Sequence, residues 1–243
     1  MIMSLTFEPG TPGVYDIATA QPFIASLETD EEQQQSMMML LNLSNLSNYV
    51  NDYAAAIGLH THVGQLRGAV LREMAPDTLE FTNNLHMLKN WDEMAGREAA
   101  MTIFHVGKAL VQIKANMRFT PTIKADVDSD TLRKVTAELE RAFPNYNFAR
   151  HAAGHRAESM ASLEKVKEHA IEIEGGQRFI MGVIEGDDFI ATFEKKLIRV
   201  PLTEDARQRL NGVVASIYSA FPKLLPMLPQ LNFGAGRVDS SDA

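Results

Sequence analysis

The sequence TLEFTNNLHMLKNWDEMAGREAAMTIFHVGKALVQIKANM (residues 78–117) is the longest unbroken helical pattern in the chain. Apolar and small side chains recur in it at steps of three and four residues, which places them on one helix face: Leu88, Trp91, Ala95, Ala99, Thr102, Val106, Ala109 and Ile113. Further apolar residues extend this surface around the helix: Met87, Met94, Met101 and Leu110. Because a helix that is apolar on more than one side normally lies inside a bundle, this stretch predicts a helical bundle.

More helices are predicted on both sides of this central one. Upstream, Thr29 and Asp30 are typical of a helix start, and Gly58 is expected to end that helix before a shorter one over about 62–74. Downstream, the pattern predicts helices over about 130–142, 146–170 and 203–221. The chain is therefore predicted to be mainly α.

The apolar pattern changes from Arg178 onward. The stretches RFIMGVI, FIATFE and KKLIRVPL are separated by turn residues and are typical of short strands in an antiparallel meander. A final helix follows them. The predicted organisation is an irregular N-terminal arm (1–29), a helical bundle (30–174), a β meander plus helix (175–222) and a Pro-rich tail (223–243).

Composition excludes several classes of protein. The 243 residues contain no cysteine, so there can be no disulfide framework, thiolate zinc site, iron–sulfur cluster or Cys nucleophile. No apolar run approaches the roughly 20 residues of a membrane-spanning helix, and the start of the chain does not resemble a signal peptide. We therefore expect a cytoplasmic protein without a membrane partner.

The charge distribution restricts nucleic-acid binding to a local site. A formal charge of −8 argues against a protein that coats nucleic acid, since phosphate binding depends on Lys and Arg. No Lys or Arg precedes Arg67, whereas residues 133–169 carry a net charge of +2. An anion site is therefore expected, if anywhere, in the second half of the chain.

The segment FARHAAGHRAE (residues 148–158) is the most informative group of polar residues. On a helix, His151 and His155 lie one turn apart on a shared face, with Arg150 at the flank. Gly154 costs on the order of 1 kcal/mol relative to Ala in a helix, which suggests that another backbone or a ligand comes close. The alternative is an ordinary close helix crossing with solvated histidines.

The pattern Arg-x4-His, with a polar residue after the arginine and late in a helical bundle, resembles the HEPN domain (higher eukaryotes and prokaryotes nucleotide-binding). The matching residues are Arg150, His151 and His155. The order of a long central helix, a shorter helix and then FPNYNFARHAAGH is also similar to uncharacterised bacterial HEPN-like proteins. The resemblance covers about residues 30–172.

This resemblance implies a metal-independent ribonuclease without a cofactor, working as a homodimer that brings two Arg-x4-His motifs into one cleft. His155 would transfer the proton, because a histidine can act as acid or base near neutral pH. Arg150 would hold the scissile phosphate, and His151 would support both. The implied ligand is RNA or a nucleotide, and the implied setting is bacterial defence or a toxin–antitoxin pair, with an antitoxin-like protein as partner.

A second hypothesis is that the chain is a non-catalytic HEPN-like module. In that case it binds a nucleotide or a protein, and the helix with the motif is only a dimer contact. The net charge suits this hypothesis better. Burial of His155 would indicate the structural role, and a position at a dimer cleft would indicate the catalytic one.

Two further groups of residues are candidate sites. His151 and His155 are half of a helical zinc site, with Glu158, His60, His62 or His105 as further ligands, but no spacing supplies a third ligand and no metal is predicted. On the central helix, Arg97, Glu98 and His105 are predicted to support the site, at least one of them facing the helix of His155. The alternatives there are a surface ion pair between Glu93 and Arg97, or a buried network that fixes helix register.

Overall fold

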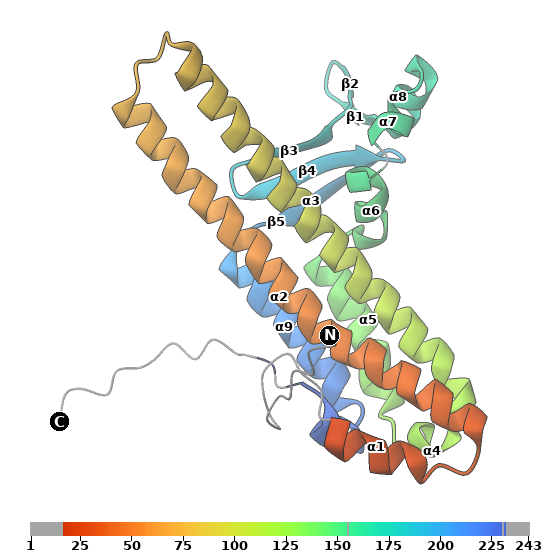
Figure 1. Ribbon diagram of the computed structural model, residues 1–243. Coiled ribbons are helices and arrows are strands. Elements are labelled where there is room, and N and C mark those ends of the chain that lie inside the picture. Colours follow the sequence, from red (N-terminus) through yellow and green to blue (C-terminus); the bar gives the residue numbers. More distant parts are fainter. Residues whose placement is uncertain (1–16, 155, 230, 232–243) are drawn as a thin grey trace, which may run out of the picture. The chain divides into compact units, whose positions relative to one another are not determined.

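The computed structural model describes residues 17–154, 156–229 and 231 (Figure 1). Contacts divide the chain into two compact units: unit 1 comprises Met1–Asn48, Ala109–Val135 and Asn211–Ala243, and unit 2 comprises Tyr49–Lys108 and Thr136–Leu210. Four long helices therefore contribute residues to both units. The predicted division into four successive regions stays a prediction.

The order of the elements agrees with a mainly α chain that carries a small antiparallel β region and a final helix, as predicted. The helices are α1 (Ile17–Ala25), α2 (Asp30–Glu73), α3 (Leu79–Asn116), α4 (Pro121–Lys124), α5 (Ser129–Ala142), α6 (Tyr146–Gly154), α7 (Arg156–Ser159), α8 (Leu163–His169) and α9 (Glu204–Ser219). The strands are β1 (Ile171–Ile173), β2 (Gly176–Arg178), β3 (Met181–Glu185), β4 (Asp188–Phe193) and β5 (Lys196–Pro201), and two 3-10 helices are η1 (Met117–Phe119) and η2 (Leu225–Met227).

Side-chain caps explain where several helices begin. The hydroxyls of Thr29, Thr78 and Thr203 each accept a hydrogen bond from the backbone N–H three residues later, at 3.1–3.2 Å. Such a bond satisfies one of the N–H groups that the first helical turn leaves without a partner. α2, α3 and α9 accordingly begin one residue after these threonines, close to the predicted starts.

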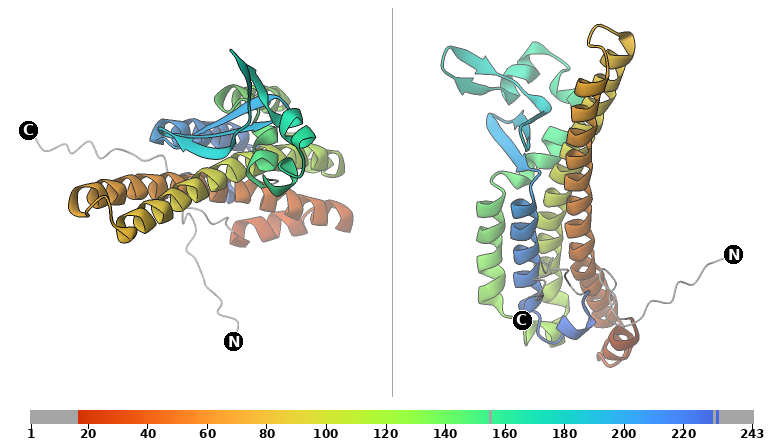
Figure 2. Two further views of the ribbon diagram at one scale, coloured as in Figure 1. Left: turned by 90° about the horizontal axis from the view of Figure 1, so that it is seen from above. Right: turned by 90° about the vertical axis from the view of Figure 1, so that its left-hand side faces the viewer.

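Helix α3 confirms the prediction for the central helix. Of the eight residues on its predicted core face, seven are buried and Trp91 is half-buried. Met87 and Met94 are exposed, so the apolar surface around the helix is only partly covered. In unit 2, α2 and α3 run side by side and are joined by a short turn (Figure 1; Figure 2, left).

Three helix predictions were wrong. Gly58 does not end α2, because pairing along α3 outweighs the roughly 1 kcal/mol that a helical glycine costs. Residues 17–25, expected in an irregular arm, form α1 despite Pro22, since Ala20 and Ile24 are buried. The helix expected over 146–170 is interrupted after Ser159, and the hydroxyl of Ser162 caps α8, which follows.

The β region of unit 2 consists of two antiparallel sheets. β1 pairs with β2, and β3, β4 and β5 follow one another in a three-stranded meander. The strands therefore begin at Ile171, before the predicted Arg178, and Gly175–Gly176 lies in the hairpin between β1 and β2. In the β3–β4 turn, Gly186 adopts φ 63°, a conformation that a side chain would strain.

In unit 2, two aromatic rings pack directly against glycines of α3. A Cβ on Gly96 would lie 2.5 Å from Cδ2 of Phe189 in β4, and one on Gly107 would lie 2.0 Å from Cε2 of Tyr146 in α6. Phe189 is fully buried, and α6 in turn contacts β3, β4 and β5. Because Gly96 and Gly107 have no side chain, the meander and α6 can approach α3 more closely than they could at any other residue type.

Unit 1 has its own core and its own ties between elements. Its fully or almost fully buried residues include Leu40, Leu43, Leu46, Leu110, Ile113, Leu132, Val135, Val214 and Ile217. The hydroxyl of Tyr218 donates to the Leu43 carbonyl at 2.8 Å, and the Thr122 N–H donates to the Glu32 carboxylate at 2.8 Å. Burial raises the pKa of Tyr218, which keeps this hydroxyl protonated. Leu224 and Met227 at the start of the Pro-rich tail are also buried.

No helix within residues 17–154, 156–229 and 231 combines the length and the apolar character needed to cross a membrane.

We predict that Gly96→Ala destabilises the protein. The new methyl group would overlap the buried ring of Phe189, and overpacking of this kind costs about 1–3 kcal/mol. Gly64→Ala is the matched control, because a Cβ there meets nothing within 4 Å and α2 would gain about 0.5–1 kcal/mol. In urea unfolding, the free energy of unfolding should fall in Gly96→Ala and rise in Gly64→Ala. A change of the same sign in both variants would contradict the packing of Phe189 against Gly96.

Candidate functional site

Helix α6, which carries two of the three predicted motif residues, packs on the meander through small side chains. Ala149, Ala152 and Ala153 are buried, and the helix contacts all three strands of the larger sheet. Gly154 is exposed and has open space where a Cβ would be. No described residue of the chain therefore comes close to Gly154, and the backbone contact of this helix is made at the three alanines; the approach of a ligand to Gly154 stays a prediction.

Arg150 is exposed and lies over an aromatic ring of α3. Its guanidinium carbon is 5.6 Å from the ring centre of Phe104, and the ammonium of Lys108 is 5.3 Å from the same ring. Both distances allow a cation–π interaction. In the part of the chain that the structure describes, neither Arg150 nor Lys108 forms an ion pair. Two cations thus lie over one buried ring, and neither is paired with a carboxylate of the described residues.

His151 is used for packing against the meander. Its ring stacks on Phe193 of β4 with centres 5.2 Å apart, and His169 stacks on the same ring at 4.4 Å. His169 is buried, and its Nδ1 accepts a hydrogen bond of 3.2 Å from the Glu194 N–H. Arg150 and His151 therefore point to different neighbours. His155, the predicted proton-transfer residue, lies outside the described residues.

The three predicted supporting residues of α3 have different surroundings. Arg97 lies 3.6 Å from the Glu93 carboxylate, so the two residues pair one turn apart, but Glu93 is buried and the pair is not the surface ion pair of the alternative. Glu98 is exposed. His105 stacks on Tyr49 of α2 with ring centres 5.6 Å apart. Burial raises the pKa of Tyr49, and the charge of Asp52 raises it further by a smaller amount. Whether any of the three faces His155 stays a prediction.

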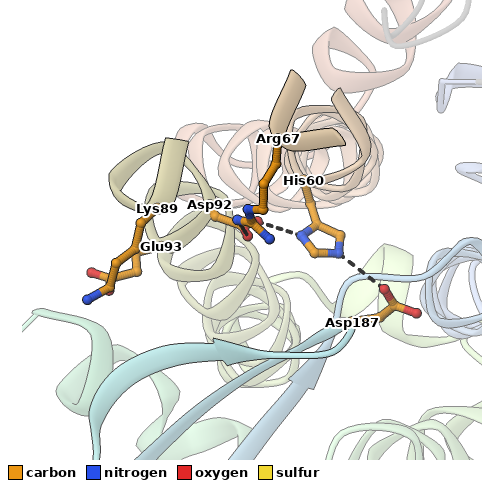
Figure 3. A network of polar contacts seen from close by, with 6 residues as sticks. All are labelled: His60, Arg67, Lys89, Asp92, Glu93 and Asp187. Atoms are coloured by element: carbon orange, nitrogen blue, oxygen red, sulfur yellow. Dashed lines mark hydrogen bonds and ion pairs between the residues drawn. The ribbon is translucent and has the colours of Figure 1, made fainter. Parts of the chain in front are cut away.

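A polar network that sequence reasoning missed lies between α2 and α3 in unit 2 (Figure 3). Asp92 is 3% exposed, and both of its carboxylate oxygens are occupied. Oδ1 lies 2.6 Å from Nδ1 of His60, and Oδ2 accepts a 2.6 Å hydrogen bond from Nη2 of Arg67. A buried carboxylate is tolerated in a protein interior when it is paired and hydrogen-bonded in this way.

His60 extends this network to the meander. Its Nε2 lies 3.3 Å from Oδ1 of Asp187, in the turn between β3 and β4 (Figure 3). Carboxylates are acceptors only, so the ring can donate to Asp92 and Asp187 together only when both nitrogens carry hydrogen. The same turn is tied down again by the Leu202 N–H, which donates to the Asp187 carbonyl at 2.6 Å.

One sequence signal could have indicated this network. Tyr53, His60 and Arg67 follow one another at seven-residue steps, which keeps them on the side of α2 that faces a partner helix. Two of these positions are polar where a coiled-coil seam is normally apolar. On α3, Asp92 interrupts the apolar face four residues after Leu88. Polar residues at such positions indicate a partner on the facing helix.

The described residues bring no metal ligands together. In residues 17–154, 156–229 and 231, no three His, Asp or Glu side chains form a group that could hold an ion. His62 is exposed, and His60 is held by carboxylates. The zinc pairing of His151 with His155 lies partly outside the described residues.

Comparisons with known proteins add no relative. No protein-family model, characterised protein or solved structure gives a significant match to this chain. The resemblance to HEPN domains therefore depends on Arg150, His151, His155 and the order of the helices.

We predict that Asp92→Asn costs more stability than Asp187→Asn. The first change leaves His60 and Arg67 facing an amide that can no longer accept from both, and we expect a loss on the order of 2–3 kcal/mol. The Asp187 side chain is 74% exposed, so its loss should cost less than about 1 kcal/mol. Equal losses in urea unfolding would show that Asp92 is not the centre of the network.

Proposed function

We propose that this protein is HEPN-like and binds RNA phosphates at α6, with Arg150 as the phosphate ligand and Lys108 beside it. The observation that supports this is the pair of cations over Phe104, which no described carboxylate neutralises. A guanidinium presents a planar set of donors that fits a phosphate at two oxygens, and a lysine adds a point charge. Stacking on a buried ring limits the motion of both side chains before RNA binds.

The resemblance to HEPN domains extends this proposal to RNA cleavage without a metal. The 2′-oxygen would attack the adjacent phosphorus, and the bond from phosphorus to the 5′-oxygen would break, leaving a cyclic phosphate. His155 would take the proton from the 2′-hydroxyl as base and, once protonated, give a proton to the leaving 5′-oxygen, and Arg150 would stabilise the charge of the phosphorane. His151, stacked on Phe193, would hold α6 in place. The complete site would need two copies of the chain.

A non-catalytic binding module is the second candidate, and the ring stack on Phe193 favours it. His151 and His169 both stack on Phe193, which gives His151 a packing role that needs no proton transfer. Such a module would bind a nucleotide or an antitoxin-like protein through the same helix. It differs from the first candidate in cleavage but not in phosphate binding.

Binding of a labelled single-stranded RNA to Arg150→Gln tests the proposal. The loss of one charged hydrogen-bonding group should weaken binding roughly 10- to 100-fold and lower its dependence on salt. Arg133→Gln is the matched control, because Arg133 is exposed and already paired with Asp130. If Arg150→Gln bound RNA as tightly as the unchanged protein, the proposed phosphate ligand would be wrong.

Cleavage of the same RNA in excess EDTA separates the two candidates. Wild-type cleavage that His155→Gln and Arg150→Gln each abolish, with folding and dimerisation intact, would support the metal-independent ribonuclease. Binding without cleavage would favour the module. A protein that sedimented as a monomer while cleaving RNA would contradict the composite dimeric site.

A further inference from the structure

One side of the hairpin formed by α2 and α3 is covered by no other described element of unit 2 (Figure 2). The meander packs on the opposite side, where Phe189 of β4 lies against Gly96 of α3. Successive residues of an α-helix are about 100° apart around its axis. Met87, which is nine positions before Gly96, therefore points away from the meander.

Apolar side chains line this side of the hairpin, which we call the outer face. Those of α3 lie within about 40° of Met87 around the helix axis. Those of α2 lie about 100–120° from His60, the residue that reaches the meander. Two of the methionines are exposed, and the other apolar residues are half-buried. The outer face comprises Leu59, Leu66, Met87, Trp91, Met94 and Met101.

The two helices contribute to one surface, because their register is fixed. Arg67 of α2 donates a 2.6 Å hydrogen bond to Asp92 of α3. The residues that precede these two, Leu66 and Trp91, therefore lie at about the same level on the neighbouring helices. Methionines one helical turn to either side of Trp91 extend the surface along α3. The outer face is thus a continuous apolar surface on two antiparallel helices, which is the kind of surface that an amphipathic helix covers.

The charged residues on the outer face are acidic. Asp52 of α2 and Glu80 and Glu98 of α3 are exposed, and none of them forms an ion pair with a described residue. No Lys or Arg of α2 precedes Arg67, and residues 80–105 of α3 include none within about 40° of Met87. A partner with cations beside its apolar side chains would be attracted here, whereas a second copy of this face would bring acid against acid.

We propose that the outer face binds an amphipathic helix of a partner protein, in which lysine or arginine flanks the apolar side chains. The apolar side of that helix lies across Leu66 and Trp91, and its cations lie beside the three acids. Half of the outer face is methionine, whose flexible side chain adapts to the shape of a partner. The proposal is independent of the RNA site, because the outer face contains neither Arg150 nor Lys108.

The fluorescence of Trp91, the single tryptophan of the chain, reports on binding at this face. The probe is a synthetic helical peptide that has leucine at steps of three and four residues and lysine elsewhere. Titration of the full-length protein with this peptide should shift the Trp91 emission to shorter wavelength and reach saturation, because binding removes the indole from water. The same peptide with glutamate in place of lysine should bind at least roughly tenfold more weakly.

Two pairs of variants test the site itself. In Met94→Lys an ammonium would face the lysines of the peptide, so the affinity should fall at least roughly tenfold. Met160→Lys is the matched control, because both methionines are 53% exposed, and it should leave the affinity unchanged. Glu98→Gln should weaken binding roughly two- to fivefold, whereas Glu164→Gln, an exposed position of α8, should leave it unchanged.

Three results would overturn the proposal: no saturable shift of the Trp91 emission, equal affinity for the glutamate peptide, or equal weakening by Met94→Lys and Met160→Lys. A protein that sediments as a dimer, and that Met94→Lys converts to a monomer, would assign the outer face to a second copy instead. Urea unfolding of each variant would verify that a loss of binding is not a loss of folding.

Discussion

The need to neutralise one buried carboxylate constrains much of unit 2. Asp92 is almost inaccessible to water, and its two oxygens are satisfied by two residues of α2 that lie seven positions apart, His60 and Arg67. Sliding α2 along α3 by one turn would leave the buried Asp92 carboxylate without partners, and apolar contacts would not compensate for the lost stability. Since His60 also reaches Asp187, the constraint extends to the β3–β4 turn. The contacts of Asp92 and His60 thereby fix the positions of α2, α3 and the β3–β4 turn relative to one another within unit 2.

Helix α3 also has two glycines at which neighbouring elements pack closely against its backbone. Gly96 admits Phe189 of the meander, and Gly107 admits Tyr146 at the start of α6. Between these glycines, Phe104 carries Arg150 and Lys108. The two glycines allow the meander and α6 to pack closely against α3, and this packing places Arg150 of α6 over the ring of Phe104. This explains why an exposed arginine, which is usually mobile, has a defined neighbour here.

Local patterns predicted the elements well where caps and periodicity agree. The bounds of α3 were predicted to within one residue, and Thr29 and Thr203 marked true helix starts. Elsewhere tertiary burial decided, as where α2 continues through Gly58. The contacts of His60 with Asp92 and Asp187 join residues 32 and 127 positions apart, so no local pattern could specify them. The sequence indicated that polar residues occupy core-facing positions, but not which partners they meet.

The acidic composition is compatible with anion binding, because net charge and local charge act over different distances. A formal charge of −8 is screened beyond about 8–10 Å at physiological salt, whereas a bound phosphate or carboxylate interacts with cations within a few ångströms. Many basic residues here are cancelled by an acid one helical turn away, as Arg133, Arg207 and Arg209 are. Arg150 and Lys108 lack such an acid among the described residues. An acidic protein can therefore attract an anion at those few points where this local cancellation fails.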